Sequence, residues 1–163
     1  MADTIALTLT AAGETVEGDS SVTSMDRADT IEVLSLEQQV STAFDRATLL
    51  PTGRRIYAPI RFTKLMDRAT PLLRQALSQN QVVSGSFRWF RPNPAGTGGA
   101  QHFFTLDFTE GRITKCTLRL PDTLDPAQAT LAPMEEVELT FATITWTHVP
   151  GAVEHTDTVH TPA

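Results

Sequence analysis

Short stretches in which apolar and polar residues alternate dominate this sequence, and they restrict the fold more than any other feature. Alternate residues of a β-strand lie on the same face, so this pattern is typical of strands with one buried side. Two successive stretches carry the apolar sets Val83, Gly85, Phe87 and Trp89, then His102, Phe104, Leu106 and Phe108. Further strands are predicted at 4–10, 30–37, 59–63, 113–120 and 137–148. Six or seven antiparallel strands predict a mainly β fold, a closed or two-sheet β-barrel.

In two of these stretches the apolar side changes partway along. The apolar positions of 30–37 pass from Ile31 and Val33 to Leu34 and Leu36, and those of 137–148 pass from Val137, Leu139 and Phe141 to Ile144 and Trp146. One extra residue reverses the side on which later side chains lie, so each change predicts a bulge or a bend between sheets. Glu110-Gly111 is predicted to be a tight turn between two strands.

One flanking α-helix is predicted after residue 69. Thr70 is expected to be its N-cap and Pro71 its first helical residue, where a missing N–H costs nothing. Asn80 is expected to end it. The apolar residues at helical spacing, expected to pack on the sheet, are Leu72, Leu73, Ala76 and Leu77.

Two segments lack a regular period. Residues 41–57 are predicted to be a long loop or an extended arm, and unpatterned segments of this length in compact domains are usually functional or disordered. The segment is therefore a candidate contact element. Residues 151–163 form a polar tail without helical or strand spacing. We expect one β-barrel domain over 1–150, because 163 residues are enough to bury a core.

Neither a membrane span nor a signal peptide is predicted. The longest apolar runs are only a few residues, and the first residues lack a basic stretch followed by an apolar one. We therefore expect a protein that is made and folded in the cytoplasm, and any export would need a route other than signal-peptide secretion.

The formal net charge of −6 is distributed unevenly along the chain. Residues 1–50 carry −7, residues 51–100 carry +7 and residues 101–163 carry −6. A basic middle between acidic flanks is consistent with a nucleic-acid surface, or with opposite faces of the subunit that attract each other across a protein interface. It is equally consistent with charges that folding mixes over the surface. The acidic total and the placement of Phe87 and Trp89 on an apolar strand face argue against nucleic acid.

The residue patterns of enzymes are missing from the sequence. Cys116 is the only cysteine and lies in an apolar-alternating stretch, where a buried thiol is expected. The histidines (His102, His148, His155 and His160) do not have the spacing of metal ligands on one helix. Phosphate-binding glycine loops and nucleophile elbows are also missing. We predict no catalytic, cofactor or metal site.

Four stretches together resemble the Hcp (haemolysin-coregulated protein) family of type VI secretion. They are Asp29-Thr-Ile-Glu-Val-Leu-Ser-Leu36, the stretch from Thr52 to Leu73, Phe87-Arg-Trp-Phe-Arg-Pro92 with His102-Phe-Phe-Thr-Leu106, and the stretch from Glu135 to His148. The resemblance runs from about residue 29 to 150. It is weaker at 10–28, and the family's usual aspartate-then-tryptophan ending is replaced by Asp157-Thr-Val159. The matching residues expected to be structural are Thr63, Lys64, Asp67, Thr70, Pro71, Arg91, Glu135 and Trp146.

The resemblance implies that six copies close into a ring and that rings stack head to tail into a hollow tube. It also implies a contractile sheath, a spike protein, small effectors held in the lumen, and export by contraction. We hypothesise that the 41–57 arm reaches a neighbouring subunit, with Arg54 and Arg55 meeting acidic groups there. The expected interface residues are Thr52, Gly53, Arg54, Arg55 and Tyr57. The alternative is a monomeric or ring-forming effector-binding carrier of the same fold that is not part of a tube.

Overall fold

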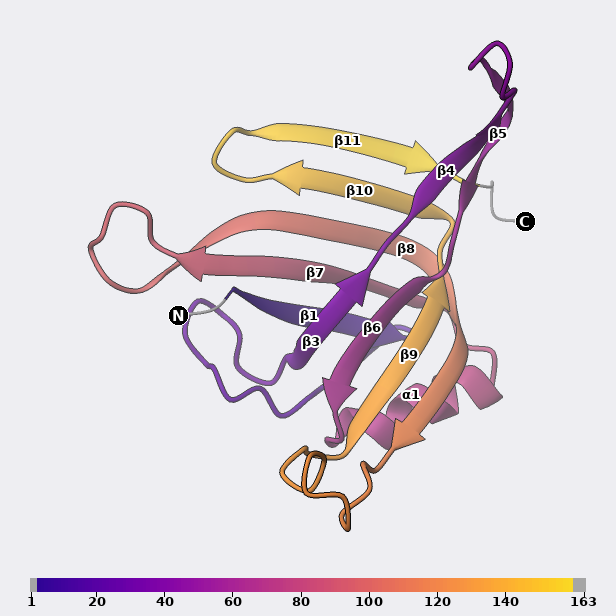
Figure 1. Ribbon diagram of the computed structural model, residues 1–163. Helices are drawn as coiled ribbons and strands as arrows, with labels where there is room; N and C mark the ends of the chain where they lie inside the picture. Colours follow the sequence, from indigo (N-terminus) through magenta and orange to yellow (C-terminus); the bar gives the residue numbers. More distant parts are fainter. Residues whose placement is uncertain (1–2, 160–163) are drawn as a thin grey trace.

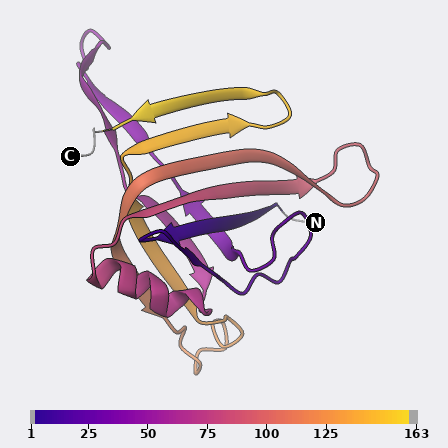
Figure 2. The same ribbon diagram turned by 180° about the vertical axis from the view of Figure 1, so that it is seen from behind.

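The computed structural model describes residues 3–159 as an antiparallel β structure with one helix (Figures 1 and 2). The strands are β1 Thr4–Ala11, β2 Glu14–Val16, β3 Ile31–Glu37, β4 Val40–Phe44, β5 Pro51–Tyr57, β6 Ile60–Leu65, β7 Val83–Pro92, β8 Ala100–Arg119, β9 Met134–Thr140, β10 Thr143–His148 and β11 Val153–Thr158, and the helix is α1 Ala69–Ser78.

Six strands close into a barrel in the order β7-β1-β3-β6-β9-β8, because β8 pairs with both β7 and β9. Strands β10 and β11 extend the sheet from β8, β2 pairs with β1, and β4 and β5 form a separate two-stranded sheet. In Figure 1 the strands β7, β10 and β11 cross the direction of β6 and β9, so the barrel has two faces. The predicted mainly β barrel is confirmed, with more strands than the sequence indicated.

The long strand β8 passes from one face to the other. Its first half pairs with β7 and β10 and its second half with β9. Glu110 lies at the bend with a positive φ of 51°. A Cβ at Gly111 would overlap the carbonyl oxygen of Thr140 on β9, so only glycine fits. The predicted tight turn at Glu110-Gly111 is therefore wrong: the pair bends a continuous strand.

The two predicted changes of apolar side both mark real irregularities. The register of β3 on β6 shifts between Val33 and Ser35, which is the bulge expected there. The predicted long strand 137–148 is two strands, β9 and β10, separated by Phe141 and Ala142, both buried. The chain leaves β6 at this break and continues beside β8.

The helix α1 begins two residues earlier than expected. Its N-cap is Arg68, not Thr70, and the Oδ1 of Asp67 accepts the Ala69 N–H at 2.9 Å. Thr70 instead turns its hydroxyl into the protein, and Pro71 remains in the first turn, where it costs no hydrogen bond. Asn80 has a left-handed φ of 49° just after the helix, as expected of its end. The buried helix residues are Ala69, Thr70, Leu73 and Ala76, whereas the predicted Leu72 and Leu77 are exposed.

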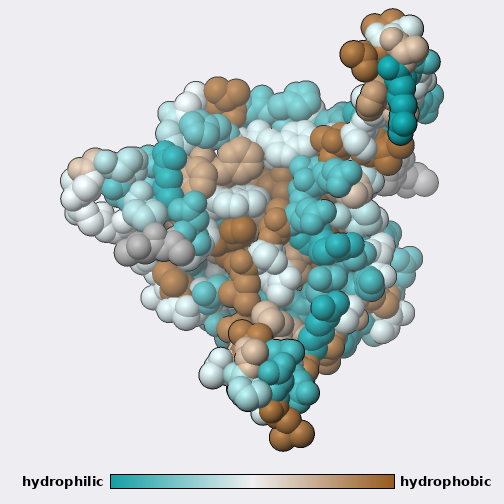
Figure 3. Space-filling view, in the orientation of Figure 1, coloured by the Kyte–Doolittle hydropathy of each residue, from teal (hydrophilic) through white to brown (hydrophobic). Residues whose placement is uncertain are grey.

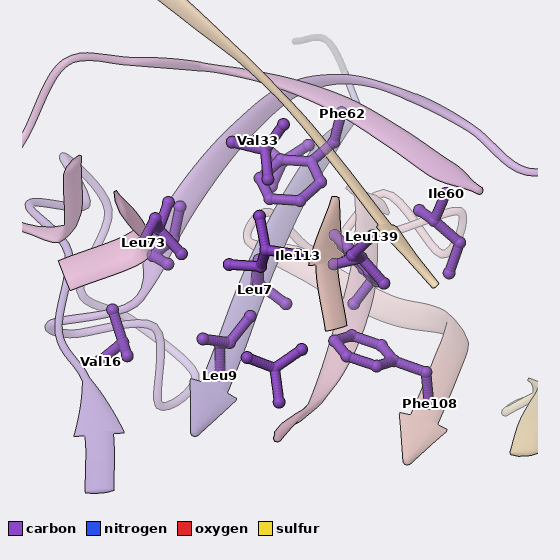
Figure 4. Close-up of a cluster of buried hydrophobic side chains, with 14 of the residues drawn as sticks. Leu7, Leu9, Val16, Val33, Ile60, Phe62, Leu73, Phe108, Ile113 and Leu139 are labelled. Atoms are coloured by element: carbon purple, nitrogen blue, oxygen red, sulfur yellow. The ribbon is translucent and has the colours of Figure 1, made fainter. Parts of the chain in front are cut away.

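The barrel interior is filled by aliphatic and phenylalanine side chains from both faces and from α1 (Figure 4). Phe87 lies at its centre, in edge contact with Phe62 and tilted against Phe108. Trp89 packs against this core but is only partly buried. Cys116 is half-buried, and burial raises the pKa of its thiol.

Within the described residues, the segment after residue 150 is not an irregular tail, and residues 160–163 of the predicted tail lie outside them. Residues Val153–Thr158 form β11, which pairs along its whole length with β10. Nearly all side chains of β11 are exposed. The sequence therefore shows no alternation of apolar and polar residues there, and this pattern does not predict the strand.

Candidate self-association surface

Residues 40–57 form the most prominent projection of the molecule (Figure 1). They fold as a two-stranded ribbon of β4 and β5, called the arm here, with its tip at residues 45–50. The Ala58 N–H donates to the Gln39 carbonyl at the base, so the arm continues from β3 into β6. The sequence predicted a loop or an extended arm, and the structure shows a paired arm.

The tip of the arm is a turn held by side-chain hydrogen bonds. The Oδ1 of Asp45 accepts N–H groups from Ala47 and Thr48, both at 2.8 Å. These hydrogen bonds lower the pKa of the Asp45 carboxyl, which remains ionised. Leu49 adopts a left-handed φ of 58°, an uncommon conformation for a bulky residue. The turn therefore holds its side chains in a set position.

Large apolar side chains cover the arm and do not contact the core. Leu49 is 72% exposed and Phe44 is 56% exposed, and Leu50 and Ile56 are equally open to solvent. Figure 3 shows this apolar surface at the top right, on the projecting ribbon. Large contiguous patches of exposed apolar residues are rare on monomeric proteins and usually mark interaction sites.

Arg55 on β5 fastens the arm to β11. Its Nη2 donates to Asp157 Oδ1 at 2.6 Å and to the Thr158 carbonyl at 3.1 Å, and its Nε donates to Asp157 Oδ2. The Tyr57 hydroxyl donates to Oδ2 of the same aspartate. Hydrogen bonds from Arg55 and Tyr57 lower the pKa of Asp157 from 3.8 to about 2. The hypothesis assigned Arg55 an acidic partner on another subunit, but its partner here lies in its own chain.

The other predicted interface residues divide between tip and base. Thr52, Gly53 and Arg54 are exposed on β5, and within the described residues Arg54 has no ion pair. Tyr57 lies at the base and is partly buried against Phe141 and Trp146. Trp146 donates its indole N–H to Gln38 at 3.1 Å and stacks on His155. Of the predicted set, Arg55 and Tyr57 bind Asp157, whereas Thr52, Gly53 and Arg54 are exposed without an ion pair within the described residues.

A buried ionic network lies between α1 and the strands β6 and β9. Lys64 and Glu135 are both fully buried, with Lys64 Nζ 2.9 Å from Glu135 Oε2. Lys64 Nζ also donates to Asp67 Oδ1 at 2.8 Å and to Thr70 Oγ1 at 3.1 Å, and Arg74 donates to Glu135 Oε1. Every charge is compensated, so the network pins α1 to β6 and β9.

Four of the residues expected to be structural therefore meet in one cluster: Lys64, Asp67, Thr70 and Glu135. The others do not join it. Thr63 lies between Ser35 and Glu136 in the sheet, Pro71 is exposed on α1, and Arg91 donates to Gln101. Sequence reasoning missed Arg74, which completes the cluster, and Asp157, which fastens the arm.

The described histidines make separate contacts. His102 stacks on Phe90, and burial together with the Arg88 charge lowers its pKa. His148 Nδ1 accepts the Gly151 N–H, and His160 lies outside the described residues. Within residues 3–159 there is no group of three or more His, Cys, Asp or Glu side chains placed to hold a metal ion. The single helix of this region is too short and too polar to cross a membrane.

Comparison with known proteins points to one family. The family described as "Type VI secretion system effector, Hcp" matches residues 8–148. The "Major exported protein" of Pseudomonas aeruginosa is 29% identical over 135 residues, which cover 82% of this chain and 77% of that protein.

Solved structures share the fold over nearly the whole chain. The Hcp1 protein from the E. coli EAEC 042 pathovar superposes with a TM-score of 0.82 at 28% identity, covering 96% of this chain and 99% of that one. A crystal structure of an Hcp protein has a TM-score of 0.86 at 21% identity, covering 99% of this chain and 100% of that one. The secreted protein Hcp3 from Pseudomonas aeruginosa has a TM-score of 0.75 at 18% identity, covering 98% and 100%.

Proposed function

The chain belongs to the Hcp family of type VI secretion proteins, and we propose that it is a structural subunit whose hexameric rings stack into the inner tube of the secretion machine. Its role is then to assemble into a structure and not to catalyse a reaction. The proposal extends the family assignment to a specific assembly, and one feature of the molecule carries it.

That feature is the anchored apolar arm. Its backbone is paired and its base is fastened by Arg55 and Tyr57 to Asp157, yet Phe44, Leu49 and Leu50 at or beside its tip are 56%, 72% and 64% exposed. A rigid projection loses little conformational entropy on binding, so the exposed apolar area is available to stabilise a contact. A second copy that covers the tip would remove this surface from water.

A tube needs contacts between unlike surfaces of one subunit. Heterologous contacts close into rings when the rotation closes, and they form filaments when another face repeats along an axis. The arm projects from one end of the barrel, and Figure 1 shows the β7–β8 loop at the other end. The two ends are therefore different surfaces, as head-to-tail stacking requires.

The remaining parts of the proposal follow from family membership. The tube would be surrounded by contractile sheath proteins and capped by a spike protein, and it would carry small effectors in its lumen. It would assemble in the cytoplasm and leave the cell on contraction without a signal peptide. Membership of a family of secreted structural proteins also supports a role without catalysis or cofactor.

Size-exclusion chromatography with light scattering tests the proposal. A ring predicts a mass near six times the subunit mass of 17.8 kDa at micromolar concentration. A mass near 17.8 kDa at every concentration would contradict it and would favour the monomeric carrier of the same fold.

A further inference from the structure

A hollow of about 360 Å³ opens between the start of β1, the 20–29 loop and the ends of β7 and β8. Its lining includes Val22, Phe90 and Ala100 together with Arg27 and Arg91. The hollow is large enough for one or two side chains. Gly99 and Ala100 in its lining place it beside the β7–β8 loop, which projects from one end of the barrel (Figure 2).

Arg27 in this hollow is a buried charge that pairs with no carboxylate within residues 3–159. It is 5% exposed, and its guanidinium lies 4.1 Å from the centre of the Phe90 ring. Three of its five N–H donors are used, by the Ser24 carbonyl at 2.9 Å, the Ser24 hydroxyl at 2.9 Å and the Thr4 hydroxyl at 3.1 Å. These partners are all neutral. Glu32 borders an adjoining small hollow, but its carboxylate binds Ser21 and forms no ion pair with Arg27.

Two more guanidinium groups surround the same site. The guanidinium of Arg88 lies 5.6 Å from the centre of the Phe90 ring and donates to the Asp26 carbonyl. Arg91 donates to Gln101 and lies over the Phe103 ring. Within residues 3–159 neither forms an ion pair with a carboxylate. Burial and the Arg88 charge lower the pKa of Arg27. Three positive groups beside an apolar wall therefore lack the anion that would balance them.

The chain itself carries a complementary surface on the loop between β8 and β9. Leu124 is 90% exposed and stands between Asp122 and Asp125. Backbone hydrogen bonds from Asp125 to Asp122 and from Gln128 to Asp125 shape this loop, so Leu124 is held outward. Figure 3 shows apolar atoms at the lower tip of the molecule, where this loop lies.

The arm tip also combines exposed apolar residues with an acidic one, but there Arg46 follows Asp45 and offsets its charge. Between Leu120 and Met134 there is no basic residue, so this acidic loop complements three arginines better than the arm does. We infer that the arginine hollow is a docking site for a second copy of this chain, which inserts Leu124 beside Phe90 and places Asp122 and Asp125 on the guanidinium groups.

This inference rests on the proposed self-assembly and adds a specific contact to it. Charge pairs at protein interfaces fix register and suppress wrong partners. The hollow is lined by Gly99 and Ala100 beside the β7–β8 loop, and Figure 1 shows this loop and the β8–β9 loop on different sides of the barrel. The contact is therefore heterologous, and each copy can offer one surface and receive the other.

Two complementary charge-reversal variants test the contact. The hollow variant carries Arg88→Glu and Arg91→Glu and retains the buried Arg27, and the loop variant carries Asp122→Arg and Asp125→Arg. Each variant alone has like charges on both surfaces, so each is expected to lose the wild-type assembly while it keeps the wild-type circular dichroism. In an equimolar mixture every hollow can meet a loop of opposite charge, so alternating assembly is expected to return.

A matched control carries Arg112→Glu and Lys115→Glu on β8, which alter the net charge as much as the hollow variant does. It is expected to assemble like the wild type. Normal assembly of the hollow variant, or a mixture that stays unassembled, would overturn the inference while the wild type still assembles and the proposed function stands.

A second measurement does not depend on assembly. A peptide with the sequence of residues 121–127 is titrated into the whole protein, and amide signals of Val22, Phe90 and Ala100 are followed by NMR. Saturable shifts are expected for this peptide and not for one with asparagine in place of both aspartates. Equal or absent shifts with the two peptides would overturn the inference, whereas specific shifts in a wild type that stays monomeric would uphold it and contradict the proposed function.

Discussion

Lys64 Nζ and Glu135 Oε2 lie 2.9 Å apart with both side chains fully buried, which makes them the ionic centre of the link between helix and barrel. Removal of one partner from a buried pair leaves the other charge uncompensated. We predict that Lys64→Met lowers the free energy of unfolding by about 3–5 kcal/mol, measured by urea denaturation.

The matched control for that variant is Arg61→Met on the same strand. Arg61 pairs with Glu138 at 3.0 Å, but its side chain is half-exposed. Exposed pairs contribute little, so a loss of less than about 1 kcal/mol is expected. If both variants lost the same free energy of unfolding, burial of the Lys64 pair would not increase its contribution to stability.

The attachment of the arm to β11 is predicted to depend on pH only in strong acid. Because the pKa of Asp157 falls from 3.8 to about 2 in the folded protein, its contribution is fully present above pH 3.8 and is lost as the pH falls through about 2. An NMR titration of the Asp157 carboxyl carbon is expected to show that midpoint. In Arg55→Gln the midpoint is expected to move up toward 3.8, and an unchanged midpoint would mean that Arg55 is not the cause.

The bend in β8 is predicted to require glycine at position 111. An added Cβ would overlap the Thr140 carbonyl on β9. Gly111→Ala is therefore expected to cost about 1–3 kcal/mol of stability through overpacking. Gly53→Ala on the arm is the control, because the nearest atom to its new methyl group is 3.9 Å away, and a change within about 0.5 kcal/mol is expected. Thermal unfolding of both variants checks the difference.

The apolar arm tip is predicted to matter for assembly and not for folding. Leu49 and Leu50 contact little within the subunit, so Leu49→Ser with Leu50→Ser is expected to change the stability of the monomer by less than about 0.5 kcal/mol. The same variant is expected to lose assembled particles in sizing chromatography. Wild-type assembly by this variant would remove the arm from the interface.

Reversal of Arg54 separates contact between subunits from attachment within one. Arg54→Glu is expected to weaken assembly and leave hydrogen exchange of β11 amides unchanged. Arg55→Glu is expected to accelerate exchange of β11, because Arg55 holds Asp157 of its own chain. If Arg54→Glu assembles normally in electron micrographs, the predicted interface role of this residue is wrong.

Alternation in the sequence predicts only those strands that bury a face. The change from Ile31 and Val33 to Leu34 and Leu36 located the β3 bulge, and the change after Phe141 located the break between β9 and β10, because in both places one side of the strand is in the core. Residues 153–158 pair fully with β10 but expose nearly every side chain, so no apolar period reveals them.

The arm was ambiguous for the same reason, since both sides of β4 and β5 face solvent. Glu110-Gly111 has the residues of a tight turn, yet a bend in a continuous strand needs the same positive φ and the same missing Cβ. In the sequence, Asp157 stands out only as a departure from the family's ending. Its pairing with Arg55 joins residues 102 positions apart, a relation that no local pattern carries.

Negative-stain electron microscopy of the purified protein tests the central claim most directly. The account predicts ring-shaped particles of six subunits with a central channel, some of them stacked end to end through the arm. A field of single 17.8 kDa subunits at every concentration, without six-membered particles, would contradict it.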